Sequence, residues 1–406
     1  MADLHVGRTT ARFIQDGHPW VRPDRFTFGL DRLRAGDVVT LMDENGRGLA
    51  SALADPTAEA CARVFHRLPG KTFDPAAAIK RAWDRRAALH ADPDTTVYRI
   101  VHGEADFIPG LRVERYGDVL VVEVRCDAIA RYADAVATAL AGLMPAARIV
   151  IKDHRDDLRR SPVANRMFDG DEASRAGARR SQDVDPSRER RAPARLFDAD
   201  EVVTVRELGV TLHARPFAGL ATGIYLDQRA TRAWLRPTIA GAKVLNLFAY
   251  TGAFSASLLA AGAAESTDVD VAAPALAIAT ANAEANGVAD RQRAIQADSG
   301  SFLTANMRTW DLIIIDPPTS ALGDGSWVLR RDYPALLRLA WSRLAPGGRL
   351  VACCNTIHGK PFLLIESLAA LGGQRLDTPA LADDVPLLKG FPEGRPYQLA
   401  AARLLS

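Results

Sequence analysis

The chain has few of the features that mark secreted, metal-binding or nicotinamide-binding proteins. Its 406 residues include four cysteines, none of them in a C-x-x-C pair, so the sequence indicates neither a disulfide framework nor a zinc site. Adjacent cysteines such as Cys353 and Cys354 rarely bridge each other. The opening stretch, MADLHVGRTTARF, lacks the apolar core of a signal peptide. We therefore expect a cytoplasmic protein without a metal ion.

Net charge is also nearly absent. A formal charge of +2 implies no global affinity for polyanions, so any contact with nucleic acid has to be local. Residues 244–264 carry no charge and are long enough to span a membrane. This stretch nevertheless contains Asn246, Thr251 and Gly252 and divides into strand, turn and helix. We therefore expect no membrane segment.

The length predicts two or three domains. Residues 1–72 are β-rich, with strands on both sides of an Asn-Gly turn. Residues 73–200 predict an α+β domain with a helix near 73–90 and strands within 98–152. Residues 153–195 are charged and show no hydrophobic period, which predicts a flexible insertion, either a solvated loop or an arginine-rich arm that becomes ordered on RNA.

Residues 201–406 alternate apolar strands with helices, which is typical of an α/β domain with a mostly parallel sheet covered on both faces. Such sheets bind ligands beyond the carboxyl ends of their strands. The strands are expected at 243–250, 264–270, 293–298, 310–318 and 349–355.

Polar residues follow several of these strands. The turn from Asn246 to Phe254, which includes Thr251, has Gly252 as its one glycine and lacks the G-x-G-x-x-G that a dinucleotide needs. This absence argues against a dehydrogenase. Three aspartates end the next three strands, Asp270, Asp298 and Asp316. One glycine turn followed by strand-end carboxylates, of which the first would accept ribose hydroxyls, fits S-adenosylmethionine.

Several motifs occur in the order found in a known family. They are GHPWVRPDRF (17–26), YRIVHGEADFIPGLRVERYGD (98–118), TGIYLDQRATR (222–232), LNLFAYTGAFS (245–255), ESTDVD (265–270), IQADSGSFL (295–303) and IIIDPPT (313–319). The chain resembles the 23S rRNA large-subunit methyltransferase I family, class I cytosine carbon-5 methyltransferases. The resemblance implies an N-terminal PUA domain, a central domain and a Rossmann-like methyltransferase domain with a seven-stranded sheet. It also places Asp227, Gln228, Arg229, Phe248, Tyr250, Asp270, Asp298 and Asp316 at cofactor-binding positions.

The end of the last apolar strand, RLVACCN (349–355), departs from that family. Members that methylate cytosine end this strand in Ser-Cys-Ser, whereas here Asn355 stands at the cysteine position and Cys354 at a serine position. Carbon-5 of cytosine needs a thiolate adduct, so a low-pKa cysteine is required. Guanine nitrogen-7 has a lone pair and needs only alignment. Asp316, Asn355 and Cys354 are the catalytic candidates. The resemblance over the whole chain implies methylation of cytosine carbon-5, and Asn355 at the cysteine position favours guanine nitrogen-7 as the alternative. A non-catalytic RNA-binding relative is a third reading.

The expected partner is large-subunit rRNA, and a homodimer is compatible with the sequence. The loop after the fourth strand and two stretches farther along the chain supply candidate RNA contacts. These are Pro317, Pro318, Thr319, Arg331, Tyr333, His18 and Trp20.

Overall fold

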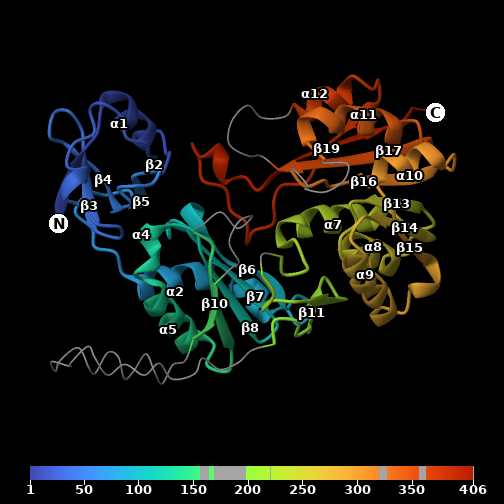
Figure 1. Cartoon of the computed structure of the whole chain (residues 1–406), viewed down its shortest axis with the longest axis horizontal. Coiled ribbons are helices and arrows are strands. Elements are labelled where there is room, and N and C mark those ends of the chain that lie inside the picture. The colour runs from blue at the N-terminus through green and yellow to red at the C-terminus, as the bar shows by residue number, and fades with distance from the viewer. Residues whose placement is uncertain (156–163, 169–197, 220, 320–326, 356–362, 406) are drawn as a thin grey trace. The chain divides into compact units, whose positions relative to one another are not determined.

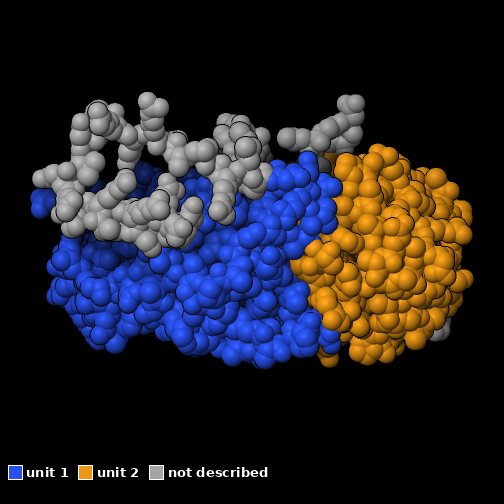
Figure 2. All heavy atoms as spheres, turned by 90° about the horizontal axis from the view of Figure 1, so that it is seen from below, with its two compact units in different colours: residues 1–203, 215–222, 383–394 blue, residues 204–214, 223–382, 395–406 orange. Residues whose placement is uncertain are grey.

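The computed structural model describes residues 1–155, 164–168, 198–219, 221–319, 327–355 and 363–405. The chain forms two compact units (Figure 2). Unit 1 contains Met1–Val203, Arg215–Thr222 and Asp383–Gly394, and unit 2 contains Thr204–Ala214, Gly223–Ala382 and Arg395–Ser406. Unit 1 thus includes a segment close to the C-terminus. The domain boundaries at residues 72 and 200 stay predictions.

The N-terminal part of unit 1 is a five-stranded sheet in the order β1-β3-β4-β5-β2. The two strands expected around the Asn-Gly turn are present as β3 and β4. Hydrophobic residues of this sheet form one core with the apolar face of α1. The elements are β1 (Ala2–His5), α1 (Arg8–Gln15), β2 (Trp20–Val21), β3 (Val38–Met42), β4 (Gly48–Ala54) and β5 (Ala62–His66).

The central part of unit 1 is a second five-stranded sheet, ordered β10-β9-β8-β7-β6. Helices α2 and α5 pack against one of its faces (Figure 1), and their apolar residues share a core with the strands. The elements are α2 (Pro75–Arg85), α3 (Ala87–Ala91), β6 (Val97–His102), β7 (Leu111–Tyr116), β8 (Val119–Val124), α4 (Asp127–Ala130), α5 (Ala133–Leu143), β9 (Arg148–Asp153) and β10 (Ala164–Met167).

The predicted flexible insertion at 153–195 is wrong in one part. Residues Ala164–Met167 form β10, which pairs antiparallel with β9. The backbone of an edge strand offers unpaired hydrogen-bonding groups that a neighbouring segment can satisfy whatever its composition, so the charge pattern gave no sign of this pairing. Residues 156–163 and 169–195 of the insertion lie outside the described residues.

Unit 2 is built around a seven-stranded sheet in the order β15-β14-β13-β16-β17-β19-β18. The first five of these strands pair in parallel, and β19 and β18 pair antiparallel. The expected α/β fold is confirmed. The strands are β13 (Lys243–Leu247), β14 (Glu265–Asp270), β15 (Gln292–Gln296), β16 (Trp310–Ile315), β17 (Leu344–Asn355), β18 (Gln374–Leu376) and β19 (Tyr397–Arg403).

Helices cover both faces of this sheet (Figure 1). Along β16, Leu312 and Ile314 pack with residues of α7, α8 and α9, whereas Ile313 and Ile315 pack with residues of α10, α11 and α12. This alternation explains why the strands read as continuous apolar runs. The helices are α7 (Arg229–Leu235), α8 (Ala253–Ala260), α9 (Ala273–Ala285), α10 (Ser299–Ala305), α11 (Leu329–Trp341) and α12 (Leu364–Ala369), and a small sheet pairs β11 (Val203–Glu207) with β12 (Val210–Ala214).

Candidate active site

The turn between β13 and α8 has an unusual backbone. Phe248, Tyr250 and Gly252 all have positive φ, at 57°, 50° and 68°. For residues other than glycine, this conformation costs roughly 1–2 kcal/mol each. A Cβ on Gly252 would lie 2.7 Å from Ala279 Cβ and 3.1 Å from Asp268 Oδ2. The turn is therefore pressed closely against β14 and α9, and strain of this kind concentrates at ligand sites.

A buried polar network lies beneath the turn. Asp268 Oδ1 accepts hydrogen bonds from the hydroxyls of Ser255 and Ser266, and its Oδ2 accepts from Gln292 Nε2 at 2.6 Å. Burial raises the pKa of Asp268 to about 6, and the hydrogen bonds that it accepts lower it. Asn246 Nδ2 donates to Ser255 Oγ at 3.0 Å. Asn246 therefore supports this network, and its contact with the cofactor stays a prediction.

Two further cofactor candidates have local hydrogen-bonding roles. Thr251 is buried and donates to the carbonyl of Gly223. Asp298 is exposed and accepts a bond of 2.8 Å from Ser301 N, so that it caps the N-terminus of α10. An exposed cap still has a free carboxylate oxygen, so Asp298 remains a candidate.

Asp270 joins the end of β14 to the strained turn. Its Oδ2 accepts from Tyr250 N at 2.8 Å, and its Oδ1 accepts from Ala272 N. The Tyr250 ring lies 5.6 Å from the ring of Tyr225, which is 60% exposed. Tyr225 was not among the predicted site residues, although it lies within the TGIYLDQRATR stretch. An exposed aromatic beside a strand-end carboxylate is suited to bind a flat, polar ligand.

Asp316, at the end of β16, lies among polar groups of the 3-10 turn before α7. Gln228 Nε2 donates to its Oδ2 at 3.1 Å. Desolvation raises the pKa of Asp316 to about 7, and the nearby carboxylate of Asp227 adds to this increase. Gln228 Oε1 is buried and has no hydrogen-bond partner among the described residues. The predicted residues Asp227, Gln228 and Asp316 are therefore brought together, and Arg229 is buried just after them.

The segment after Asp316 is fixed by aromatic residues. Pro317 is buried and Pro318 is exposed. Trp327, which was not predicted, donates from Nε1 to Pro318 O at 2.8 Å, and its ring lies 5.1 Å from that of Phe248. Trp327 therefore links the strained turn to the proline segment.

Asn355 and the cysteines before it have different surroundings. Asn355 is exposed, and its Nδ2 lies 3.5 Å from Thr319 Oγ1. Cys353 and Cys354 have no exposed surface. Burial raises the pKa of Cys353 well above its ordinary value and that of Cys354 to about 12. A reactive cysteine has a lowered pKa and access to its substrate. Cys354 instead packs in the core with α11 and α12, so the structure speaks against it as a nucleophile.

The prediction that Tyr333 stacks on an RNA base is wrong. Tyr333 is fully buried, and its hydroxyl donates to Cys353 O at 2.6 Å. The helix α11 begins at Leu329, so Tyr333 falls on its inward face. Arg331 of the same helix is exposed and pairs with Asp332 at 2.7 Å.

His18 and Trp20 belong to unit 1 and are half-buried. Trp20 Nε1 donates to Glu104 Oε1 at 2.8 Å, and its ring lies 4.8 Å from that of Phe391. His18 Nε2 lies 3.4 Å from Glu393 Oε1. Both side chains contact the segment Asp383–Gly394 and hold it against the N-terminal sheet. RNA contact by either of them stays a prediction.

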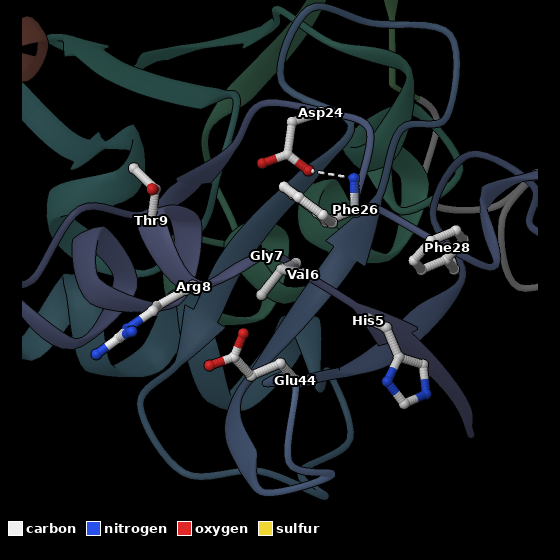
Figure 3. Close-up of a pocket in the computed structure, with 9 residues that line it drawn as sticks. All are labelled: His5, Val6, Gly7, Arg8, Thr9, Asp24, Phe26, Phe28 and Glu44. Carbon is white, nitrogen blue, oxygen red and sulfur yellow. Dashed lines mark hydrogen bonds between the residues drawn. The ribbon is translucent and has the colours of Figure 1, made fainter.

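A cavity of about 390 Å³ lies elsewhere on the N-terminal sheet (Figure 3). Phe26 and Phe28 contribute exposed rings, 50% and 61% accessible, and Arg8 extends along its rim. Asp24 Oδ1 fixes the backbone of Phe26 through a bond of 2.9 Å. The sequence gave no signal for this cavity, because its lining residues come from segments that are separated in the chain.

The sequence matches known protein families in both units. Residues 200–385 match the family model of S-adenosylmethionine-dependent methyltransferases, and residues 4–67 match that of PUA-like domains. Ribosomal RNA large subunit methyltransferase I of Photobacterium profundum is 30% identical, with 96% of each chain covered. A ribosomal RNA large subunit methyltransferase of Deinococcus radiodurans is 31% identical, with 87% of this chain and 85% of its own covered. The chain belongs to the family of ribosomal RNA large subunit methyltransferases.

Solved structures show the same fold. A methyltransferase crystallised with SAH superposes with a TM-score of 0.81 over 100% of both chains at 21% identity. A methyltransferase from Streptococcus mutans superposes with a TM-score of 0.78 over the same coverage. As a member of its family, the chain is an S-adenosylmethionine-dependent methyltransferase with a PUA-like N-terminal domain. Among the described residues, no helix has the length and apolar character to cross a membrane, and no cluster of three potential metal ligands occurs.

Proposed function

We propose that this methyltransferase modifies a base of large-subunit rRNA in the cytoplasm, and that the atom methylated is nitrogen-7 of guanine. The observation that carries the choice of atom is the contrast at the end of β17. Asn355 is exposed beside Thr319, whereas Cys353 and Cys354 are fully buried with raised pKa values. The choice of rRNA is supported by the names of the relatives and by the PUA-like domain. A homodimer stays a prediction.

The residues of unit 2 fit S-adenosylmethionine. Gln228 Oε1 is a buried acceptor without a partner among the described residues, which suits an amino group. The carboxylate of Asp270 and the exposed ring of Tyr225 suit a ribose and a flat base. Gly252 allows close approach, because a Cβ would already meet Ala279. We infer that these residues, with Asp227, Arg229 and Asp316, hold the cofactor.

S-adenosylmethionine supplies a methyl group on a positively charged sulfur. The N–CH₃ bond forms from the nitrogen-7 lone pair as the S–CH₃ bond breaks, so no proton has to be removed and no general base is needed. The task of the protein is therefore alignment, which alone can supply several kcal/mol. Guanine presents nitrogen-7 and oxygen-6 as neighbouring acceptors. Asn355 Nδ2 would donate to oxygen-6, which leaves the nitrogen-7 lone pair free to react.

Methylation of cytosine carbon-5 is the second candidate. The near full-length similarity to ribosomal RNA large subunit methyltransferase I favours it. This reaction would require Cys353 or Cys354 to attack the base as a thiolate. Cys354 would have to leave the core, and either thiol would have to ionise against a pKa raised by burial.

Nucleoside mass spectrometry distinguishes the two reactions. Unmodified large-subunit rRNA is incubated with the protein and methyl-labelled S-adenosylmethionine and then digested. We expect labelled 7-methylguanosine, a reduction of about tenfold in kcat/KM for Asn355→Ala from one lost base contact, and retained transfer for Cys354→Ala. Labelled 5-methylcytidine that disappears in Cys353→Ala or Cys354→Ala would establish the carbon-5 reaction instead.

A further inference from the structure

One face of the central sheet of unit 1 carries a polar row. His102, Arg112, Glu123, Lys152 and Asn165 are successive cross-strand partners on β6, β7, β8, β9 and β10. Residues directly opposite each other in a sheet share a face. Their neighbours along the strands pack in the core under α2 and α5, so the polar row lies on the other face; these neighbours include Val113, Val122 and Ile151.

Among the residues that the structure describes, cations outnumber carboxylates on this face. The cations Arg99, Arg112, Arg125 and Lys152 stand against two carboxylates, Glu114 and Glu123. Arg99 and Glu114 form a close pair at 2.7 Å. Glu123 is the carboxylate that lies within 4 Å of Arg112 and Arg125, and Glu114 acts on Arg112 and Lys152 from farther away. We call Arg112, Glu123, Arg125, Lys152 and His154 the open charge cluster.

Within the open charge cluster, a single oxygen atom serves three partners. Glu123 Oε2 lies 3.5 Å from Arg112 Nη1, 3.4 Å from Arg125 Nη1 and 3.7 Å from His154 Nδ1. These contacts are longer than the 2.7–2.9 Å of a good charge-assisted hydrogen bond. Lys152 Nζ donates to backbone carbonyls, one of them Gly219 O at 3.0 Å, and forms no ion pair with a carboxylate of the described residues.

The environment makes this excess of positive charge unfavourable. Burial and the neighbouring Arg99 and Arg125 together lower the pKa of Arg112 to about 10. Burial also lowers the pKa of Lys152 to about 8. Uncompensated charge in a desolvated position is costly. An added anion would offset that cost.

The cluster is open to such an anion on one side. The side chains of Arg112 and Arg125 are 30% and 46% exposed, whereas that of Glu123 is 6% exposed. His154 is 3% exposed at its side chain, and its Nε2 has no hydrogen-bond partner among the described residues. Guanidinium groups match the oxygens of a phosphate in a planar, bidentate arrangement.

We propose that the open charge cluster binds a backbone phosphate of the RNA substrate, a role that rests on the proposed action on rRNA. Phosphate contacts position a protein on nucleic acid without reading its sequence. Unit 1 would thereby contribute to RNA affinity through its central sheet as well as through its PUA-like domain. Arg112 and Arg125 are the groups that contact the phosphate, and Glu123 occupies them until RNA binds.

The first test measures RNA affinity against salt concentration for the double variant Arg112→Gln, Arg125→Gln. The probe is a fragment of unmodified large-subunit rRNA that the wild-type protein binds and methylates. We expect roughly tenfold weaker binding at 0.1 M salt and a salt slope smaller by about 1. The matched control is Arg81→Gln, an exposed residue of α2 that packs on the opposite side of the same sheet. Equal losses in the control would overturn the proposal.

The second test uses Glu123→Gln and predicts a change of opposite sign. Removal of the competing carboxylate frees both arginines, so we expect roughly threefold to tenfold tighter RNA binding and a steeper salt dependence. A purely structural role for Glu123 predicts weaker binding, because the cluster would lose its organising anion. Retained thermal stabilisation by S-adenosylmethionine shows that each variant is folded. Weaker or unchanged RNA binding by folded Glu123→Gln would contradict the proposal.

A further arm separates RNA from free phosphate. Millimolar inorganic phosphate should change the thermal midpoints of wild type and Glu123→Gln by no more than chloride does at equal ionic strength. A larger, saturable shift would assign the cluster to a small anion and overturn the RNA role. If the wild-type protein neither binds nor methylates rRNA, the proposed function itself fails. If it does both and the variants behave as wild type, only the role of the cluster fails.

Discussion

A buried pair of unit 2 and a charged group of unit 1 arrange their charges differently. In unit 2, Arg232 and Glu207 are each 2% exposed at the side chain and form a bidentate pair, with Nε–Oε1 at 2.6 Å and Nη2–Oε2 at 2.7 Å. In unit 1, one oxygen of Glu123 is shared at 3.4–3.7 Å by Arg112, Arg125 and His154. In the first arrangement, each carboxylate oxygen accepts a short hydrogen bond from the arginine. In the second, three nitrogen donors share one oxygen at longer distances. We call the first arrangement closed and the second open. We expect a closed pair to stabilise the fold and an open group to be able to bind a ligand.

The same contrast exists within unit 2. Asp268 is fully buried, but three donors bond to its two oxygens. Asp316 accepts one bond from Gln228 and lies near a second carboxylate, Asp227. Two carboxylates therefore lie close together, with Arg232 as a nearby cation, and such a group suits the positively charged sulfur of S-adenosylmethionine. The open charge cluster is rich in cations and its proposed ligand is an anion, whereas Asp227 and Asp316 are carboxylates and their proposed ligand is a cation.

The largest expected effect comes from breaking the closed pair. Arg232→Met leaves Glu207 buried without its partner, which typically costs about 3–5 kcal/mol of unfolding free energy. Arg112→Met, the matched change in the open charge cluster, should cost less than about 1 kcal/mol, because Arg125 and His154 remain near Glu123 and Arg112 is partly exposed. Urea unfolding followed by hydrogen exchange within each unit measures both. If both variants lost the same unfolding free energy, the distinction between the closed pair and the open charge cluster would be wrong.

A smaller effect is expected at the strained turn. Gly252→Ala would place a methyl group 2.7 Å from Ala279 Cβ, and overpacking of this kind costs about 1–3 kcal/mol. Gly287→Ala is the matched control, because Gly287 has nearly the same φ, +65°, and a Cβ there would meet nothing within 4 Å. Thermal unfolding and titration with S-adenosylmethionine should show a greater loss for Gly252→Ala in both measurements. If Gly252→Ala and Gly287→Ala lose the same stability and the same cofactor affinity, the positive φ causes the loss and the close contact with Ala279 does not.

Hydrophobic pattern predicted the fold of unit 2 well. The strands expected at 264–270, 310–318 and 349–355 are present as β14, β16 and β17, and their ends bring Asp270 and Asp316 to the same edge of the sheet. Continuous apolar runs separated by helical segments allow few other arrangements. The strand β10 was missed because backbone pairing needs no hydrophobic pattern.

The site could be predicted only in part. Strand-end aspartates follow from topology, but the orientation of a side chain in a helix or strand depends on where the element begins. Tyr333 faces the core because α11 starts at Leu329. Trp327 and Tyr225 contact the turn through packing between segments distant in sequence. The open charge cluster combines one residue from each of three strands with Arg125 and His154, which directly follow β8 and β9, and the register of the sheet shows that the strand residues share a face.

The smallest effect concerns the pH dependence of Asp316. Asp227→Asn removes a neighbouring negative charge, so the pKa of Asp316, raised to about 7 mainly by desolvation, should fall by roughly one unit, a change worth about 1.4 kcal/mol. Because the folded-state pKa lies above that of an unfolded aspartate, this group stabilises the fold most at low pH, and the stability is lost as the pH rises through 7. In the variant, that loss is complete at a lower pH. Carboxyl titration by ¹³C NMR measures the shift, with Asp332→Asn, at a half-buried residue of α11, as the control. If the pKa of Asp316 stayed near 7 in Asp227→Asn, desolvation alone would raise it. Asp227 and Asp316 would then not be an electrostatically coupled pair.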